Sequence, residues 1–538
     1  MFAREKFTDE ETAILSGFFT NVDSPVFALL NLPEVVKGAL FARYSRSPKS
    51  LRRLFLDEFY NQPDAAVQEL AEGGSNNATP VSLERAEGLF DRVFFQYGDD
   101  SVAQLGGAHI AVEQASNILT KVLEWGRLAA YLEQSTRYMF YDQKLEDRYR
   151  YTAPPEVESG PLAGEYAETM DWLFDEYSAL VHTCVPFFEK QSPKQEGDSN
   201  FIYKSSIRAK ACDVARGLLP AATFSNVGIF ASGQAYESML IRMNSHPLGE
   251  ARDCAGMMLK ELRRVIPSFL KRVDLPDRGG AWSNYYQENH DAMERIASRI
   301  YVEPEHADEV TLVEWDPEAE DKIAAAALYA HSDLTDTQLH SVVQNMSADD
   351  KAEVIRAYVG DRQNRRHKPG RGMERSFYRF DVLSDFGSFR DLQRHRMMTF
   401  DWQRLGVRHG YSIPPVIEEV GWRQRWDDAM GRMTEFHGSV NGQHGPDVAQ
   451  YVVPFGFRLR YSMQFNAREA FHMLELRTTE QGHPDYRRVC QAMHTLIREK
   501  AGHVALADAM SYTDHDSYDL GRLESERRAE KRRKPEAG

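Results

Sequence analysis

The stretch on which the fold and the site depend is Phe389-Arg-Asp-Leu-Gln-Arg394-His395-Arg396-Met-Met-Thr-Phe400. Arg394 and Arg396 carry fixed positive charges, and the imidazole of His395 between them can change its protonation near neutral pH. Such a triplet suits an anionic ligand, although Arg-His-Arg on an exposed helix is also common as a solvated basic surface. Apolar and aromatic residues stand on both sides of the triplet, so we expect it to border a buried surface.

Size and composition indicate a globular protein with more than one domain. The 538 residues are too many for one ordinary core, and 42 % hydrophobic and 27 % charged residues are typical of globular domains. The formal net charge of −16 argues against general nucleic-acid binding, so basic clusters should mark local sites for small anions. We expect no nucleic-acid partner.

Cysteine usage and hydropathy indicate the compartment. The four cysteines, Cys184, Cys212, Cys254 and Cys490, show no Cys-x-x-Cys spacing, which fits a reducing compartment and gives no zinc or redox signature. They read as small buried hydrophobes. The N-terminus has no apolar signal core, and no run of about 18 apolar residues occurs. We therefore expect a cytoplasmic protein that has no membrane partner.

A change of composition divides the chain near residue 305. Residues 303–309 are acidic and contain proline, and Val310-Thr-Leu-Val-Glu-Trp315 then has the composition of a first strand. From about Asp516 the residues are mostly charged or polar, which predicts a solvated tail with no core. The expected division is a domain at residues 1–300, a second at 310–515 and a charged tail at 516–538.

Short motifs recur in the same order in both parts of the chain. The recurring pairs are Ala215-Arg216-Gly-Leu-Leu-Pro220 with Ala449-Gln450-Tyr-Val-Val-Pro454, and Glu237, Arg242 and His246-Pro247 with Glu475, Arg477 and His483-Pro484. Two copies in one order predict a tandem duplication rather than a solenoid.

Glu133, Ser135 and Arg137 alternate along the chain. On an extended backbone all three would point the same way and offer an acceptor, a hydroxyl and a guanidinium to one ligand. The alternative is a helix-end cap with a surface ion pair. The residues alone leave both interpretations open.

These motifs resemble the signature of the flavin-dependent thymidylate synthases, the ThyX family. Arg394-His395-Arg396 resembles the start of the family's Arg-His-Arg-x7-Ser signature, and Glu133-Gln134-Ser135-Thr-Arg137 resembles its end. Val452-Val-Pro454, followed by Asn466-Ala-Arg468, His472 and Leu476-Arg477, is similar to the family's closing region. The resemblance implies an α+β fold of two tandem ThyX-like domains, each a mixed sheet packed with helices.

Each half departs from the family pattern where the other half matches it. Arg404 stands where the signature has serine, and Trp125-Gly126-Arg127 occupies the place of Arg-His-Arg in the first half. Arg216 matches the family's substrate arginine, whereas Gln450 stands in its place in the second copy. The resemblance therefore implies one composite site built from both halves and a reciprocal site that is dead.

The resemblance also implies the roles of the site residues. Substrate binding falls to Glu133, Gln134, Ser135, Arg137, Arg216, Arg394 and Arg477, of which Arg394 and Arg477 are also expected to be catalytic. Cofactor binding falls to Arg394, His395, Arg396, Glu374, Asn466, Arg468 and His472, and no metal is expected. Neither half has a clean His-x-Ser-x-x-Glu-His flavin motif, to which Glu374-Arg375 is the nearest match.

The activity implied by the resemblance is methylation of dUMP to dTMP. FAD would be the cofactor, NADPH and methylenetetrahydrofolate the co-substrates, and the protein a homodimer that mimics the family tetramer. Methylation at C5 of uracil needs donors on the pyrimidine carbonyls, and guanidinium forks also bind phosphate. Two other interpretations stay open: a diverged flavin- or nucleotide-binding enzyme of another reaction, and a catalytically inactive scaffold in which the arginines only make ion pairs.

Overall fold

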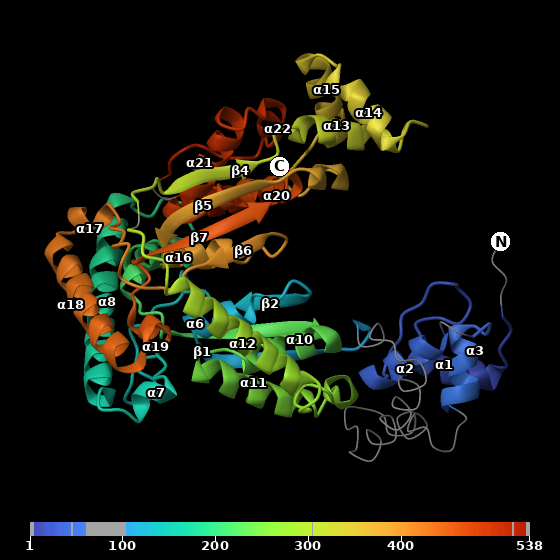
Figure 1. The fold of residues 1–538 in the computed structure, drawn as a ribbon, viewed down its shortest axis with the longest axis horizontal. Coiled ribbons are helices and arrows are strands. Elements are labelled where there is room, and N and C mark those ends of the chain that lie inside the picture. The colour runs from blue at the N-terminus through green and yellow to red at the C-terminus, as the bar shows by residue number, and fades with distance from the viewer. Residues whose placement is uncertain (1–4, 45–46, 61–103, 304, 519–520, 534–538) are drawn as a thin grey trace. The chain divides into compact units, whose positions relative to one another are not determined.

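The computed structural model describes residues 5–44, 47–60, 104–303, 305–518 and 521–533 (Figure 1). The chain divides into two compact units. The first comprises residues 1–112, 128–133 and 226–301, and the second comprises 113–127, 134–225 and 302–538. Helices and strands are both present in each unit, which confirms the α+β class.

The first unit is built on a three-stranded sheet in the order β1-β3-β2. Its strands are β1 (Gly107–Ser116), β2 (Ala129–Glu133) and β3 (Phe224–Ser232). The last four residues of β1, 113–116, and the first two of β3, 224–225, belong to the second unit. β2 and β3 pair antiparallel, with Glu133 opposite Val227. The remaining elements are α1 (Asp9–Phe18), α2 (Glu34–Tyr44), α3 (Leu51–Leu54), η1 (Phe55–Tyr60), α10 (Gly233–Asn244), α11 (Gly249–Leu262), η4 (Pro267–Leu270) and α12 (Gly279–Ala297).

The second unit is built on a four-stranded sheet in the order β4-β5-β7-β6. Its strands are β4 (Val310–Trp315), β5 (Tyr378–Asp385), β6 (Thr399–Trp402) and β7 (Arg458–Phe465), so the strand expected at Val310–Trp315 is confirmed. All three strand pairs are antiparallel, whereas a mixed sheet was expected. Tyr378, Phe380 and Val382 alternate along β5 and are buried, as the two-residue period of a strand requires when one face packs on a core.

Helices surround this second sheet. They are α6 (Asn117–Leu123), α7 (Pro155–Glu158), α8 (Ala163–Gln191), α9 (Asn200–Ala215), η3 (Arg216–Leu218), α13 (Ala319–Tyr329), α14 (Asp336–Gln344), α15 (Ala348–Val359), η5 (Arg371–Arg375), α16 (Phe386–Leu392), α17 (Val416–Glu419), α18 (Arg423–His444), α19 (Pro446–Ala449), η6 (Gln450–Val452), α20 (Ala467–Arg477), α21 (Pro484–Glu499), α22 (Val504–Ala509) and α23 (Gly521–Arg533). The long helices α8 and α18 are joined by Arg425, whose guanidinium forks onto Glu176 at 2.9 Å.

The order of elements confirms the duplication. β1, α6, β2, α8, α9, η3, β3, α10 and α11 of the first half recur as β5, α16, β6, α18, α19, η6, β7, α20 and α21 of the second. The strand order β1-β3-β2 likewise recurs as β5-β7-β6, and β4 is added at the edge. The two halves of the chain therefore share one topology.

The halves meet inside the second unit at their equivalent Pro-containing turns. Ala221 N donates to Val453 O at 2.9 Å, and Phe455 N donates to Leu219 O at 2.8 Å. These bonds are related by a pseudo-two-fold exchange of the halves. Gly217 fits against Trp426 of α18 at this junction, where an added Cβ would lie 2.5 Å from the indole ring, so a larger residue would displace that ring.

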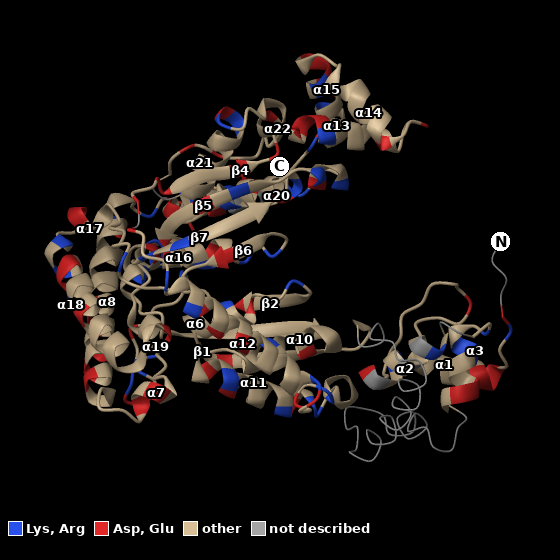
Figure 2. Ribbon diagram, viewed as in Figure 1, with Lys and Arg blue, Asp and Glu red and all other residues tan. Residues whose placement is uncertain are grey.

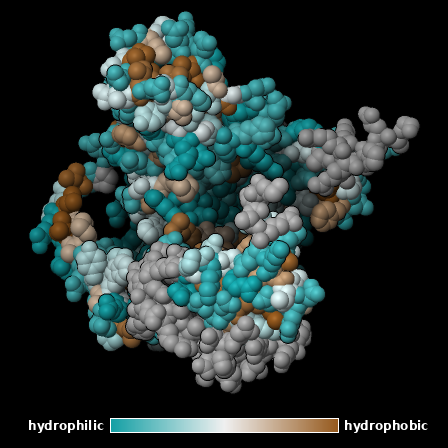
Figure 3. Space-filling model, turned by 90° about the vertical axis from the view of Figure 1, so that its right-hand side faces the viewer, coloured by the Kyte–Doolittle hydropathy of each residue, from teal (hydrophilic) through white to brown (hydrophobic). Residues whose placement is uncertain are grey.

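Helices α13–α15 carry a small core of their own, made by Ala324, Ala325, Leu339 and Val343. They lie at the top of Figure 1, and Figure 3 shows apolar side chains gathered at the top of the molecule. Tyr329, Leu334 and Val342 are among the exposed apolar residues there. Along the rest of the ribbon, Lys and Arg are interspersed with Asp and Glu (Figure 2).

Three expectations about single segments are settled by the structure. All four cysteines are buried and free, as expected. Among the described helices, none combines the length and the apolar character needed to cross a membrane. The charged tail was expected to be solvated, but part of it forms α23, where Leu523 is buried and Arg527 forks onto Asp198 at 2.8 and 2.6 Å. Residues 534–538 lie outside the described part.

Candidate active site

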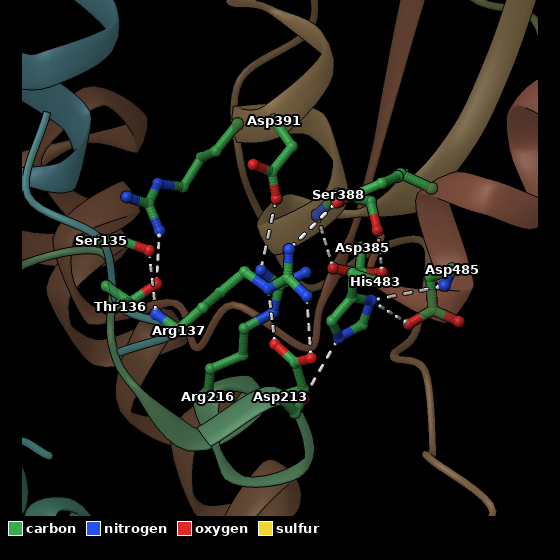
Figure 4. Close-up of polar contacts among 12 residues, drawn as sticks. Ser135, Thr136, Arg137, Asp213, Arg216, Asp385, Ser388, Asp391, His483 and Asp485 are labelled. Atoms are coloured by element: carbon green, nitrogen blue, oxygen red, sulfur yellow. Dashed lines mark hydrogen bonds and ion pairs between the residues drawn. The ribbon is translucent and has the colours of Figure 1, made fainter. Parts of the chain in front are cut away.

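An arginine of the first half, Arg137, forms a forked ion pair with Asp213 (Figure 4). Arg137 follows β2 in a turn, and Asp213 lies in the last turn of α9. Nε and Nη2 of Arg137 lie 2.6 and 2.9 Å from the two carboxylate oxygens, and Nη1 donates to the Tyr486 hydroxyl at 3.0 Å. Burial would raise the pKa of Asp213, but the charge and hydrogen bonds of Arg137 lower it to about 2. The carboxylate is therefore ionised and Arg137 is fully engaged.

Arg216 is a buried arginine with one nitrogen that has no acceptor among the described residues. It ends α9, and only 3 % of its surface is exposed. Its Nη1 lies 3.4 Å from Asp391 Oδ2, and its Nη2 is buried with no hydrogen-bond partner among the described residues. Gly387 lets the guanidinium lie against α16, because an added Cβ there would be 3.1 Å from Cζ. A buried guanidinium N–H without an acceptor is costly unless a ligand supplies one.

Asp391, at the end of α16, is the carboxylate on which the arginines converge. Arg216 reaches it at 3.4 Å and Arg477 at 3.8 Å. Burial would raise the pKa of Asp391, but the charges of Arg216, Arg477, Arg394 and Arg137 hold it well below its usual range. Arginines of both halves thus surround one carboxylate, with more positive than negative charge.

His395 connects the second-half arginine Arg477 to Glu469. Arg477 Nε donates to His395 Nε2 at 2.9 Å, so the proton of the ring lies on Nδ1, which faces Glu469 Oε1 at 2.8 Å. Burial lowers the pKa of His395 to about 4, and the charge of Arg477 acts in the same direction. The expectation that this imidazole changes its protonation near neutral pH is therefore wrong: burial keeps it neutral.

Glu469 also lies beside His472, at 3.4 Å from its Nδ1. Burial would raise the pKa of Glu469, but its hydrogen bonds from His395 and His472 lower it to about 2. One ligand atom from each of these three side chains lies within 4.8 Å of the others, a spacing that could hold a metal ion. Because both nitrogens of His395 are already engaged, the cluster as it stands is a hydrogen-bonded network.

Of the other expected cofactor residues, Arg468 and Glu374 lie together, with Nη1 of Arg468 3.3 Å from Oε1 of Glu374. Asn466 caps helix α20, where its Oδ1 accepts from Glu469 N at 2.9 Å. Arg394 is exposed and Arg396 is half-buried at the start of the turn to β6.

The segment from Glu133 to Arg137, for which an extended strand and a helix-end cap with a surface ion pair were both open, is neither: it is the end of a strand followed by a turn. β2 ends at Glu133, which belongs to the first unit, while Gln134 onward belongs to the second. Ser135 turns inward to accept from Arg137 N at 3.2 Å, and Gln134 Nε2 lies 2.8 Å from Met139 Sδ. Arg137 therefore owes its position to this turn and not to the alternation of side chains along a strand.

Sequence reasoning missed the carboxylates that hold these cations, namely Asp213, Asp391 and Glu469. A signal existed for two of them. Asp213 precedes Arg216 by three residues and Glu469 precedes His472 by three, the spacing that puts side chains on one helix face. It named His483 only as part of the recurring His-Pro motif, yet this residue is buried next to them: its Nε2 lies 3.2 Å from Asp213 O, and its Nδ1 accepts from Asp485 N at 3.3 Å.

The reciprocal positions of the second half also lie together. Arg404 Nε lies 2.7 Å from Asp447 Oδ1, and Gln450 Oε1 accepts from Leu405 N at 3.0 Å. The position of Asp391 is held by Val122 in the first half. An arginine forked onto an aspartate is thus present in both halves, but Arg216 and Asp391 have no charged counterpart at the equivalent positions of the other half.

Comparison with known proteins places the chain in a family. The family model of the thymidylate synthase complementing proteins matches residues 47–268 and again 311–502. The chain belongs to this family. Two matches to one family model are what a tandem duplication requires.

Three similar proteins match the chain over different lengths. A UPF0159 protein of Chlamydia pneumoniae is 37 % identical over 532 residues, covering 98 % of each chain. A flavin-dependent thymidylate synthase of Clostridium tetani is 24 % identical over 222 residues, which are 40 % of this chain and 83 % of that protein. A solved structure of the UMP/dUMP methylase PolB from Streptomyces cacaoi, bound with 5-Br dUMP, is 17 % identical with a TM-score of 0.31, covering 38 % of this chain and 96 % of its own.

Proposed function

We propose that this protein is a flavin-dependent thymidylate synthase that methylates dUMP, with FAD as cofactor and methylenetetrahydrofolate and NADPH as co-substrates. The reaction would occur at one composite site, to which the first copy, residues 1–300, and the second, residues 310–515, each contribute. The observation that carries the proposal is Arg216, a buried guanidinium whose Nη2 has no acceptor in the described part of the chain and which lies beside a carboxylate crowded by arginines.

The roles of the arginines follow from their contacts. Arg137 already has Asp213, Tyr486 and Gln481 as acceptors, so it anchors the site. The contacts of Arg216 and Arg477 with Asp391 are long, at 3.4 and 3.8 Å. The guanidinium donors that these contacts leave unsaturated would turn to the phosphate or to a pyrimidine carbonyl. Donors on the carbonyls make C5 electron-rich, which is what methylation at C5 needs.

His395 is a positioning residue in this proposal. Because it is neutral and held by Glu469, its Nε2 is a fixed acceptor that sets the direction of Arg477. Replacement by a side chain without an acceptor at that position would leave the guanidinium free to turn toward Asp391.

Residues of the second copy fit a flavin in their chemistry. His472 is 46 % exposed and Arg468 is 40 % exposed, and with Arg394 they offer donors to phosphates or to a ring system. Arg396, Glu374 and Asn466 complete the proposed set. When bound, the flavin would supply the hydride, and the role of these residues is to hold and orient it.

The absorption spectrum of the purified protein, with and without dUMP, tests the proposal. The expected result is flavin bands that dUMP perturbs in the wild type. Arg216→Gln, which copies Gln450, should weaken dUMP binding about 10- to 100-fold, because a charge-assisted contact contributes about 1.5–3 kcal/mol. Gln450→Arg is the matched control and should bind dUMP like the wild type.

The other outcomes separate the alternatives. A flavin whose spectrum ignores dUMP would indicate a diverged flavoenzyme. A colourless protein that ignores added FAD would indicate the inactive scaffold.

A further inference from the structure

A basic loop comes just before the candidate flavin residues of the second copy. It comprises residues 361–368, Asp-Arg-Gln-Asn-Arg-Arg-His-Lys, and lies between α15 and η5. The carbonyl of Pro369, the next residue, accepts from Arg468 Nε at 3.1 Å. Arg468 also contacts Glu374, so the basic loop adjoins two of the residues to which the proposed function assigns the cofactor.

The basic loop is built around the side chain of Arg362. Nη1 and Nη2 of Arg362 fork onto Glu475 at 2.7 and 2.5 Å, and the two side chains are 4 % and 0 % exposed. Cζ of Arg362 lies 5.2 Å from the ring centroid of Phe471 and 5.1 Å from that of Tyr512. Its Nε donates to His367 O at 2.7 Å. Glu475 therefore neutralises Arg362, and the guanidinium holds the backbone of the loop.

Further bonds close the turn inside the loop. His367 N donates to Asn364 O at 3.1 Å, and Arg366 N donates to Asn364 Oδ1 at 2.9 Å. The Tyr512 hydroxyl donates to Arg362 O at 2.6 Å. The backbone that carries the cations is thus fixed before any ligand arrives, which lowers the entropy cost of binding one.

Three cations of the loop have charges that no neighbour neutralises. The side chains of Arg365, Arg366 and Lys368 make no hydrogen bond or ion pair with any described residue. Arg366 and Lys368 are exposed, and Arg365 is half-buried. Asp361 is the one carboxylate in the sequence of the loop. In a protein of net charge −16, such a group of cations is suited to a small anion.

The cations of the loop also act on one another. Partial burial lowers the pKa of Lys368, and the charges of Arg362 and Arg365 lower it further. The charges of Glu475 and Glu469 oppose this lowering, but Glu475 is forked by Arg362 and Glu469 belongs to the histidine network described above. Like charges held close together cost free energy, which a bound anion would offset.

The first copy has no such group of cations in its sequence. Asp385 and Ser116 are the N-caps of the equivalent helices α16 and α6, and aligning them places residues 361–376 opposite residues 92–107. The stretch 92–107, most of which lies outside the described residues, contains Arg92 as its one Lys or Arg. The stretch 361–376 contains six, namely Arg362, Arg365, Arg366, Lys368, Arg371 and Arg375. The positive charge therefore belongs to the copy that carries Arg394-His395-Arg396.

We propose that the basic loop binds the phosphates of a dinucleotide, with Arg365, Arg366 and Lys368 as the donors. Guanidinium groups bind phosphate oxygens in pairs, and an ammonium binds them as a point charge. Arg362 is a positioning residue that holds the loop. The identity of the dinucleotide rests on the proposed function: FAD and NADPH both carry a pyrophosphate. Binding needs no chemical step.

Titration calorimetry of the full chain with inorganic pyrophosphate tests the loop directly. Arg366→Gln and Lys368→Gln should each weaken pyrophosphate binding about tenfold, because each loses one charge-assisted contact. Lys190→Gln is the matched control. Lys190 is exposed near the end of α8 and makes no ion pair with any described residue, and its replacement changes the net charge by the same amount. Thermal unfolding midpoints of all three variants should match the wild type, since the replaced side chains are exposed.

Three results would overturn the phosphate site. They are a wild type that does not bind pyrophosphate, loop variants that bind it as tightly as the wild type, and a loss in Lys190→Gln equal to that in the loop variants.

The same variants identify the source of the phosphates. If they weaken FAD but not riboflavin, which has no phosphate, the loop binds the flavin cofactor. If they leave FAD unchanged but raise the NADPH concentration that half-saturates flavin reduction, the loop binds the co-substrate. Variants that weaken pyrophosphate but neither dinucleotide would overturn the assignment to a dinucleotide. A wild type that binds pyrophosphate through the loop but has a flavin spectrum that ignores dUMP would refute the proposed function and leave the phosphate site standing.

Discussion

Arg137 of the first half and Arg404 of the second make the same forked ion pair in different surroundings. Nε of Arg137 lies 2.6 Å from Asp213 and Nε of Arg404 lies 2.7 Å from Asp447. The side chains of the first pair are 11 % and 12 % exposed, and those of the second are 33 % and 26 % exposed. Three residues after the carboxylate, the first half has Arg216 and the second has Gln450.

This difference distinguishes a residue that stabilises the fold, Gln450, from one that is suited to bind a ligand, Arg216. Gln450 is neutral and satisfies the backbone, accepting from Leu405 N at 3.0 Å and donating to Asp447 O at 3.2 Å. Arg216 is charged and buried, and one of its nitrogens has no partner among the described residues. Both halves fork an arginine onto the equivalent aspartate, although Arg404 occupies the position of Ser135 and not that of Arg137, so the fork alone does not distinguish the two halves. The second arginine is what distinguishes the candidate site.

The largest expected effect is the loss of the buried fork. Arg137→Ala leaves Asp213 with 12 % exposure and without its partner, and loss of one partner from a buried pair costs about 3–5 kcal/mol. Arg404→Ala breaks an exposed pair, which contributes about 0–1 kcal/mol. Urea unfolding of both variants measures the difference. Equal changes in the free energy of unfolding would show that burial does not distinguish the two forks.

A second comparison concerns the two His-Pro turns. His246 Nδ1 accepts from Leu248 N at 3.2 Å, and His483 Nδ1 accepts from Asp485 N at 3.3 Å, so the turns have the same local bond. Leu248 is buried, whereas Asp485 puts a carboxyl near Asp385, Arg488, Arg216 and His483. Burial, with the nearby Asp385, raises the pKa of Asp485 to about 7.

The raised pKa predicts a loss of stability toward alkaline pH. The folded state holds the proton of Asp485 more tightly than the unfolded state, so the contribution is complete below the ordinary carboxyl pKa and is lost as pH rises to about 7. Asp485→Asn should remove this loss. Relative to the wild type, its free energy of unfolding should rise by about 2–3 kcal/mol between pH 5 and pH 8, since this interval covers about two pKa units and each corresponds to about 1.4 kcal/mol.

Thermal or urea unfolding at pH 5 and pH 8 measures this change. Asp485→Leu, which copies Leu248, is the matched variant, and its pH dependence should be as shallow as that of Asp485→Asn. A wild type and an Asp485→Asn variant with parallel pH profiles would contradict the assignment.

The sequence was sufficient for the duplication, the strand at Val310–Trp315 and the arginines that gather around Asp391. These follow from local motifs, whose order is visible along the chain. The partners of the arginines are not local: Arg137 lies 76 residues from Asp213, and Arg216 lies 175 residues from Asp391. Burial, which keeps His395 neutral, is likewise set by the packed fold rather than by the Arg-His-Arg triplet. For the same reason the sequence did not reveal that α23 packs on α9.

The smallest expected effect concerns the caps of two equivalent helices. Asn466 caps α20 and Ser232 caps α10, through bonds of 2.9 Å from Glu469 N and 3.3 Å from Ala235 N. The sequence assigned Asn466 to the cofactor, but the capping bond alone would explain an asparagine there. Asn466→Ser keeps a capping oxygen, as Ser232 does, and should change stability by only a few tenths of a kcal/mol, whereas Asn466→Ala should cost about 1 kcal/mol.

FAD titration of the stable Asn466→Ser variant then separates the capping role of Asn466 from its proposed role in cofactor binding. We expect weaker FAD binding, because the shorter side chain can cap the helix but loses the amide NH₂. If Asn466→Ser binds FAD like the wild type, Asn466 is a helix cap and nothing more.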